Sequence, residues 1–215
     1  MLELVSNGTV LNDTWLFDSH SLFWSQLLTP VAPSARFSSV SATHNDGDTY
    51  VFGGFSASIT PLDDLWVFRS SSLTWELMST LNQGPSARGF MTGYFMGDDF
   101  IIVSGCDSLT QVNYIFACVN SFNETWSFNI NTKLWNNTNV SGTYPSSFSL
   151  ETQIIDDSQL LVYANNKYTM AAFYVLSTAD SSWSQIQFNS ISPLPDGRNW
   201  ASFVTFDTDY YMFGG

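Results

Sequence analysis

The sequence predicts an all-β fold, a β-propeller of four-stranded blades, and two kinds of repeated hairpin predict it. In the first kind, an aromatic residue is followed nine positions later by tryptophan, four times along the chain. In the second kind, an apolar strand reaches a turn with acidic residues or glycine, and a more apolar strand follows. The two kinds alternate with a period of about 50 residues, and four strands per period are typical of a propeller blade.

The first kind, named here the tryptophan hairpin, consists of two short apolar runs separated by a tight polar turn, and we name its strands c and d. Because aromatic rings recur at one spacing, we expect them to pack between neighbouring blades. The four copies are TWLFDSHSLFW, LWVFRSSSLTW, TWSFNINTKLW and FYVLSTADSSW, with the pairs Trp15 and Trp24, Trp66 and Trp75, Trp126 and Trp135, and Tyr174 and Trp183.

The second kind, named here the glycine hairpin, follows each tryptophan hairpin along the chain, and we name its strands a and b. Two glycines after a buried strand predict a sharp exit with positive φ angles, which other side chains resist. The hairpin opens at PSAR (33–36), PSAR (85–88), PSSF (145–148) and PDGR (195–198). Its strand b ends in YVFGG (50–54), IIVSGC (101–106), VYAN (162–165) and YYMFGG (210–215).

The double glycine, the aromatic residue some twelve positions beyond it and the tryptophan nine positions later are together similar to the kelch repeat. The resemblance spans essentially the whole chain. The copy at 145–188 departs most from the kelch pattern, with Tyr174 for tryptophan, Phe148 for arginine and Ala164–Asn165 for the glycine pair. We therefore expect that blade to differ most from the others in geometry.

The repeats define a single domain over residues 1–215, with three blades at about 33–78, 85–137 and 145–188. The fourth blade is split, because residues 195–215 hold only strands a and b and residues 12–27 hold only strands c and d. Pairing of these two ends would close a ring of four blades without an exposed edge. The alternative is part of a larger ring, since the kelch resemblance implies six or seven blades.

The charge of the chain excludes one class of partner. Six lysines and arginines against nineteen aspartates and glutamates give a net charge of −13. Nucleic acids and anionic membrane surfaces both require clustered cations, so neither is expected as a partner. No apolar run approaches the roughly 18 residues of a membrane helix, so we expect no membrane insertion. The first residues also lack the basic and apolar regions of a signal peptide.

Patterns typical of catalytic and metal sites are missing from the sequence. His20 and His44 fall in expected turns without triad spacing, and we expect both to be solvated. No His-x-His, His-x-x-x-His or Cys-x-x-Cys motif occurs. Some kelch-fold proteins are copper oxidases, but that site needs two histidines with a tyrosine and a cysteine at the channel mouth. We expect no enzyme activity, metal or cofactor; an oxidase or carbohydrate-active propeller enzyme is the alternative.

Two features bear on the compartment. Cys106 and Cys118 belong to the longest b–c loop, 107–122, which favours a disulfide bridge, with two unpaired thiols as the alternative. Chance alone would place about as many N-glycosylation sequons as the chain has, but all of them fall in expected loops or at strand ends. They begin at Asn7, Asn12, Asn123, Asn136 and Asn139. We expect an extracellular or lumenal domain of a longer protein, with a cytoplasmic domain as the alternative.

We expect function to reside in one face of the propeller, where the b–c and d–a loops emerge around the channel. Arg36, Arg88 and Arg198 begin strand a in three blades, so their guanidinium groups should gather at this face, and Phe148 stands in the fourth position. These arginines either bind a carboxylate-bearing ligand or pair with neighbouring acids and carbonyls.

The 107–122 loop is the second candidate feature of that face. Its Tyr114 and Phe116 either anchor a protein partner or fold back onto the blade. The leading hypothesis is a non-catalytic protein-interaction module in a secreted or cell-surface protein, because the chain looks like the kelch segments of large multidomain ectodomains. An intracellular kelch adaptor or scaffold is the alternative.

Overall fold

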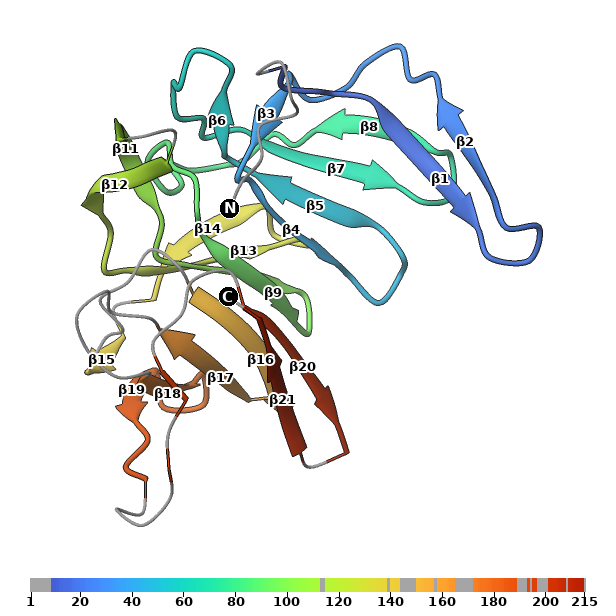
Figure 1. The fold of residues 1–215 in the computed structure, drawn as a ribbon. Helices are drawn as coiled ribbons and strands as arrows, with labels where there is room; N and C mark the ends of the chain where they lie inside the picture. The colour runs from blue at the N-terminus through green and yellow to red at the C-terminus, as the bar shows by residue number, and fades with distance from the viewer. Residues whose placement is uncertain are drawn as a thin grey trace.

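The structure is a computed structural model, and the part of the chain that it describes contains β-strands, turns and loops but no helix (Figure 1). The described residues are 9–112, 115–138, 140–143, 150–156, 158–164, 172–188, 193, 195–196, 201–207 and 209–214.

Blade one is a four-stranded antiparallel sheet whose strands follow one another in chain order, as strands a to d. It consists of β4 (Val40–Thr43), β5 (Thr49–Phe52), β7 (Leu65–Arg69) and β8 (Thr74–Leu77). The b–c ladder pairs Val51 with Trp66, and the c–d ladder pairs Phe68 with Trp75. In the structure, the two hairpins within residues 33–78 form one sheet.

Blade two repeats this order, with β9 (Thr92–Met96), β10 (Asp99–Val103), β13 (Thr125–Asn129) and β14 (Leu134–Asn137). Blade three consists of β16 (Leu150–Asp156), β17 (Gln159–Ala164), β18 (Ala172–Ser177) and β19 (Ser182–Gln185). Blade three differs from the others by a fifth strand, β15 (Ser141–Gly142), which runs parallel to β19. The sequence does not predict this edge strand.

The split fourth blade is present as two separate two-stranded sheets. One is the tryptophan hairpin β1 (Thr14–Asp18) and β2 (Phe23–Leu27), and the other is the glycine hairpin β20 (Ser202–Phe206) and β21 (Asp209–Phe213). In the described residues no ladder joins them, and Figure 1 shows β1–β2 near β8 while β20–β21 lies beside β16. The all-β propeller class is confirmed, whereas closure of the ring stays a prediction.

The ends of strand b turn sharply, as the small residues predict. Gly53 and Gly54 have φ angles of 62° and 97°, and Gly105 has a φ of 117°. A Cβ atom on Gly53 would lie 2.5 Å from the carbonyl oxygen of Arg88. All three glycines are therefore required by backbone conformation, and Gly53 also by the close approach of the next blade.

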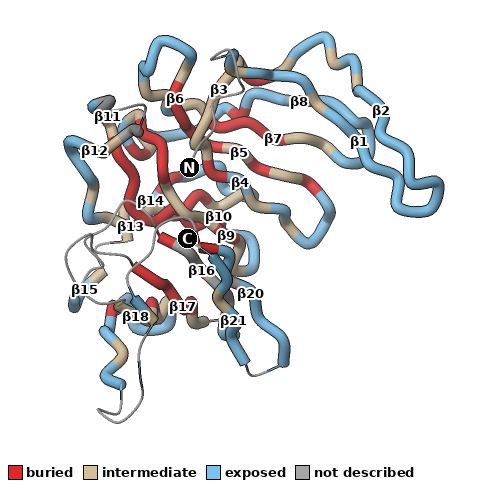
Figure 2. Tube along the Cα trace, viewed as in Figure 1, coloured by how far each residue is buried: buried red, intermediate tan, exposed pale blue. Residues whose placement is uncertain are grey.

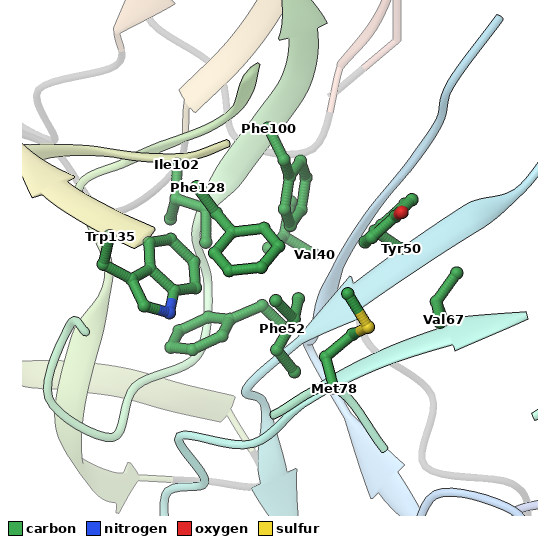
Figure 3. Packing of buried hydrophobic residues seen from close by; sticks show 10 residues of the cluster. Val40, Tyr50, Phe52, Val67, Met78, Phe100, Ile102, Phe128 and Trp135 are labelled. Atoms are coloured by element: carbon green, nitrogen blue, oxygen red, sulfur yellow. The ribbon is translucent and has the colours of Figure 1, made fainter. Parts of the chain in front are cut away.

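The hydrophobic core lies between blades. Tyr50 and Phe52 of blade one pack against Phe100 and Trp135 of blade two (Figure 3), and the rings of Phe52 and Trp135 are 5.3 Å apart between centroids. A second cluster joins blades two and three through side chains such as Tyr94, Ile101, Leu160, Tyr174 and Trp183. The prediction that the paired aromatic residues pack between blades is confirmed for Trp135, Tyr174 and Trp183.

The same prediction is wrong for the first tryptophan hairpin. Trp15 and Trp24 are 50% and 63% exposed, and in the described residues β1 and β2 form a sheet of their own. Figure 2 shows the same difference at the level of strands, with buried residues concentrated in the three complete blades and exposed residues along β1, β2, β20 and β21.

Candidate recognition face

The b–c connections of blades one and two are among the loops for which the sequence predicts a common face. In blade one, β6 (Phe55–Ser56) pairs with β3 (Arg36–Phe37). In blade two, the 107–122 segment forms not an irregular loop but a hairpin, β11 (Cys106–Val112) and β12 (Ile115–Ser121). We name it the β11–β12 arm. These segments, with the start of each blade, constitute the face that we call the recognition face.

The base of the β11–β12 arm is fixed by a small apolar cluster. Phe55, Phe90 and Cys106 are buried there, with Phe37 and Leu109 packed against them. Gly89 and Cys106 exchange backbone hydrogen bonds of 2.9 and 2.8 Å. Because these residues come from blades one and two, the arm is anchored across the junction of the two blades.

Cys106 is the first residue of β11, and Cys118 lies on β12, where the ladder pairs it with Leu109. The structure pairs their sulfur atoms, with the two Cα atoms 5.9 Å apart. This separation is in the ordinary range for a bridge. The pairing ties the start of β11 to β12, so it would hold the base of the arm closed. The disulfide predicted from the sequence thus has the necessary geometry, and its presence in the protein stays a prediction.

Arg88 lies at the base of the arm, with its side chain 1% exposed. Its guanidinium donates hydrogen bonds to the carbonyl oxygens of Ser86 and Ser104 at 2.9 and 3.1 Å, and it forms an ion pair with Glu124. The ring of Phe122 lies 3.8 Å from the guanidinium carbon. Arg88 therefore links the start of blade two to both ends of the arm.

Arg36 makes the corresponding contacts in blade one. It donates to the carbonyl oxygens of Ser34 and Gly53 at 3.1 and 2.9 Å, and it forms a bidentate ion pair with Asp64, both contacts at 2.7 Å. We name this repeated arrangement the arginine clamp. In each copy the arginine binds a serine two residues earlier, a carbonyl at the end of strand b and an acid two residues before the tryptophan of strand c.

The surroundings of Asp64 determine the pKa of its carboxyl group. Burial by itself would raise the pKa of Asp64, but hydrogen bonds from Arg36 and from the indole of Trp66 outweigh burial and hold the pKa below its ordinary value. Asp64 therefore remains ionised in the clamp well below neutral pH. Of the two roles that the sequence leaves open for these arginines, the structure places Arg36 and Arg88 in contact with neighbouring acids and carbonyls.

The sequence did not predict a contact between the a–b turns of blades one and two. His44, expected to be solvated, is only 12% exposed in its side chain. It lies between Asp46 of its own turn and Asp98 of blade two, at 3.0 and 3.3 Å, with its ring against Phe95. A turn position cannot reveal this burial, because the neighbouring blade creates it. His20 is solvated as expected, with 99% of its side chain exposed.

Several predicted site residues cannot be placed. Tyr114, Phe148 and Arg198 lie outside the described residues, as do the sequon positions Asn7 and Asn139. Phe116 belongs to β12, but its side chain is not among those described. The remaining sequon residues are described and exposed, namely Asn12, Asn123 and Asn136.

The described residues contain no group of three or more histidine, cysteine, aspartate or glutamate side chains placed to hold a metal ion. Within the same part of the chain, no helix has the length and apolarity that crossing a bilayer requires.

Comparison with known proteins tests the kelch resemblance directly. The model of the KLHDC2/KLHL20/DRC7 Kelch-repeats domain matches residues 3–215. The chain belongs to the kelch-repeat family. Kelch-repeat domains generally mediate protein–protein binding. The arginine clamp, the glycine exits and the tryptophan hairpins are thus parts of the repeat unit of a kelch-repeat domain.

Curated relatives share this kelch-repeat region. The chain is 27% identical over 189 residues to tip elongation aberrant protein 1 of Schizosaccharomyces pombe, covering 84% of this chain and 16% of that protein. It is 30% identical over 102 residues to human kelch domain-containing protein 3, covering 46% of this chain and 26% of that protein. It is 29% identical over 101 residues to acyl-CoA-binding domain-containing protein 4 of Arabidopsis thaliana, covering 46% of this chain and 15% of that protein. The kelch-repeat domain therefore matches only a minor part of the length of each relative.

Proposed function

We propose that this kelch-repeat domain is a non-catalytic protein-interaction module that binds its partner through the recognition face. The observation that supports the proposal is the β11–β12 arm, an elongated hairpin with its base anchored across two blades. An arm held at its base loses little conformational freedom when a partner binds its outer part. The arm follows β10 and precedes β13, so it extends from the ends of the two central strands of blade two (Figure 1).

The chemistry of the arm fits a protein partner. Val119 on β12 is 65% exposed, so the arm offers an apolar contact. In the described residues β11 and β12 form their own two-stranded sheet, which leaves backbone edges that a strand of another protein can extend. The net charge of −13 favours a partner surface with basic groups around this contact.

We assign Arg36 and Arg88 to support of the recognition face. Both guanidinium groups are buried and hold the loops of the face through the arginine clamp. A partner would then contact the outer surface of the loops, and loss of either arginine would weaken binding by displacing those loops.

A matched pair of variants tests this binding face. Val119→Asp places a charge on the arm, and Leu134→Asp places one at an exposed position in the tryptophan hairpin of blade two, where Leu134 is 44% exposed. Both substitutions should leave the fold intact, because both side chains are exposed. We expect the unmodified protein and Leu134→Asp to capture the same protein, identified by mass spectrometry, and Val119→Asp to lose it. Equal capture by all three would refute binding through the arm.

We further propose that the domain is extracellular or lumenal. Exposure of the described sequon residues and the pairing of Cys106 with Cys118 support this assignment. Non-reducing peptide mapping of protein from its native source tests it by searching for glycan mass and for a peptide that links the two cysteines. Unmodified asparagines with free thiols would instead indicate a cytoplasmic kelch adaptor.

A further inference from the structure

The outer strand d of blades two and three is bonded on its open side by a short segment of the same chain. In blade three, β15 pairs in parallel with β19, and Thr143 donates a backbone hydrogen bond of 3.2 Å to the carbonyl oxygen of Trp183. In blade two, the side-chain amide of Asn82 donates to the carbonyl oxygen of Trp135 at 2.6 Å and accepts from its backbone nitrogen at 2.7 Å. We name these segments the covers, because they close a strand edge that another chain could otherwise extend.

Both covers occupy the same position in the repeat, three residues before the proline that opens the glycine hairpin. This residue is Asn82 in blade two, Gly142 in blade three and Pro30 in blade one. A proline has no side-chain amide, so Pro30 cannot make the bonds of Asn82. Its ring also fixes φ near about −65°, whereas Gly142 has a φ of 96°. Pro30 is therefore compatible with neither kind of cover.

The cover of blade two also depends on a close contact that blade one cannot repeat. A Cβ atom on Gly84 would lie 2.6 Å from the indole nitrogen of Trp135. Blade one has Ala32 at the position of Gly84, one residue before the proline. Because alanine carries that Cβ atom, the segment before blade one cannot lie against its tryptophan as the segment before blade two does.

The outer edge of β8 is open in the part of the chain that the structure describes. β8 pairs with β7 in the same register as β14 with β13, so Trp75 presents its backbone N–H and C=O outwards as Trp135 does. Among the described residues, no ladder and no hydrogen bond reaches the outer side of Trp75. Thr14 of β1 accepts a hydrogen bond of 2.9 Å from the indole of Trp75, which is a contact of the ring and not of the backbone. Trp75 is accordingly only half-buried, whereas Trp135 is buried.

The surroundings of this edge define the chemistry of a partner. Leu73 and Leu77, at the two ends of β8, are 41% and 54% exposed and offer apolar contacts. Asp48 and Glu76 share the guanidinium group of Arg69, so this part of blade one keeps a net negative charge. The net charge of −13 of the chain acts in the same direction. A strand with alternating apolar and basic side chains would match both features.

We propose that the outer edge of β8 binds an extended, basic segment of a partner protein by β-strand addition. The backbone of this segment bonds to Trp75 as the amide of Asn82 bonds to Trp135. Its apolar side chains contact Leu73 and Leu77, and its basic side chains lie near Glu76. This second contact surface uses no residue of the β11–β12 arm.

Two synthetic peptides of the sequence Lys-Val-Lys-Val-Lys-Val test the edge, one unmodified and one N-methylated at every peptide bond. The methylated peptide keeps the charge and the side chains but has no backbone donors. Hydrogen exchange of the full chain, followed by NMR, reports on the amide of Trp75, with Trp135 as the internal control. In the protein alone we expect Trp75 to exchange at least about tenfold faster than Trp135. The unmodified peptide should slow Trp75 about tenfold and leave Trp135 unchanged, and the methylated peptide should slow neither.

A variant that carries a cover in blade one supplies the second readout. Pro30→Asn combined with Ala32→Gly gives blade one the residues of the blade-two cover, and it should weaken binding of the unmodified peptide. Val119→Asp should bind this peptide as the unmodified protein does, which separates the edge from the arm. Equal effects of both peptides on Trp75, no effect of either, or unchanged binding to the double variant would overturn the proposal. Protection of Trp75 in the protein alone would also overturn it, and a rise with protein concentration would identify a second copy as the occupant.

Discussion

At the scale of single residues, the arginine clamp explains why arginine and not lysine stands before strand a, which begins at Val40 and Thr92 and not, as the sequence predicts, at Arg36 and Arg88. One guanidinium group binds two backbone carbonyls and a carboxylate at fixed angles in both described clamps, which an ammonium group cannot do with the same geometry. The sequence held a signal for the acidic partner, since Asp13, Asp64 and Glu124 all lie two residues before a tryptophan. The spacing identifies the acid as the partner of the arginine only when the register of strands b and c is known.

Replacing Arg88 by methionine should reduce the free energy of unfolding by about 3 to 5 kcal/mol, because removal of one partner leaves Glu124 without its buried cation. Urea unfolding followed by tryptophan fluorescence measures the change. Lys133→Met is the control, since Lys133 is exposed, and it should alter stability by less than about 0.5 kcal/mol. Equal effects of the two substitutions would contradict a structural role for the clamp.

The lowered pKa of Asp64 predicts that its contribution to the free energy of unfolding depends on pH. Its pKa in the folded protein is lowered, so its ionised form stabilises the fold fully above the unfolded value of about 3.9 and this contribution disappears as the pH falls through the folded pKa. Asp64→Asn should therefore cost about 1 to 3 kcal/mol at pH 7 and progressively less below about pH 4.

Urea unfolding of both proteins between neutral and acidic pH measures this difference. Asp63→Asn is the matched control, because Asp63 is the exposed neighbour of Asp64. A difference between wild type and Asp64→Asn that stays constant with pH would show that packing, and not charge, causes the loss.

At the scale of elements, the sequence predicted both kinds of hairpin but not how the tryptophan hairpins turn. The residue two positions before each tryptophan of strand d adopts a positive φ, although none of the four is glycine. These residues are Leu22, Leu73, Lys133 and Ser181, with φ between 51° and 59°. Their side chains give no local signal for this conformation, so the strand pairing imposes it.

The β11–β12 arm was likewise not predicted as a hairpin. Its segment combines polar residues with an apolar run at 114–119, and the cluster at its base includes Phe55 and Phe90 from outside the segment. Local sequence patterns cannot report such distant contacts. The same reason explains why the sequence alone could not choose between the two roles of the arginines.

The hairpin turns offer a stabilising substitution. Lys133→Gly should increase the free energy of unfolding by about 1 kcal/mol, because glycine adopts the φ of 57° without the steric cost of a side chain. Thr132→Gly in the same turn should decrease it, since Thr132 has no positive φ and glycine only adds freedom to the unfolded chain. Thermal unfolding of the two variants measures both effects, and a loss of stability in Lys133→Gly would contradict the strained turn.

At the scale of the whole molecule, burial falls from the complete blades towards the two separate hairpins. Hydrogen exchange should therefore be slowest in the central strands, such as β10, where four successive residues from Phe100 to Val103 are buried. The backbone of β1 and β21 should exchange fastest in dilute protein.

The location of the core between blades, described for Phe52 and Trp135, has a consequence for how such a molecule can change in length. The apolar interior is a series of similar seams, that is, apolar clusters that each lie between two neighbouring blades. Duplication or loss of one repeat would add or remove one seam and leave the others chemically unchanged. Gene rearrangement in units of one repeat is therefore compatible with folding, whereas a break inside a repeat would disrupt both a ladder and a seam.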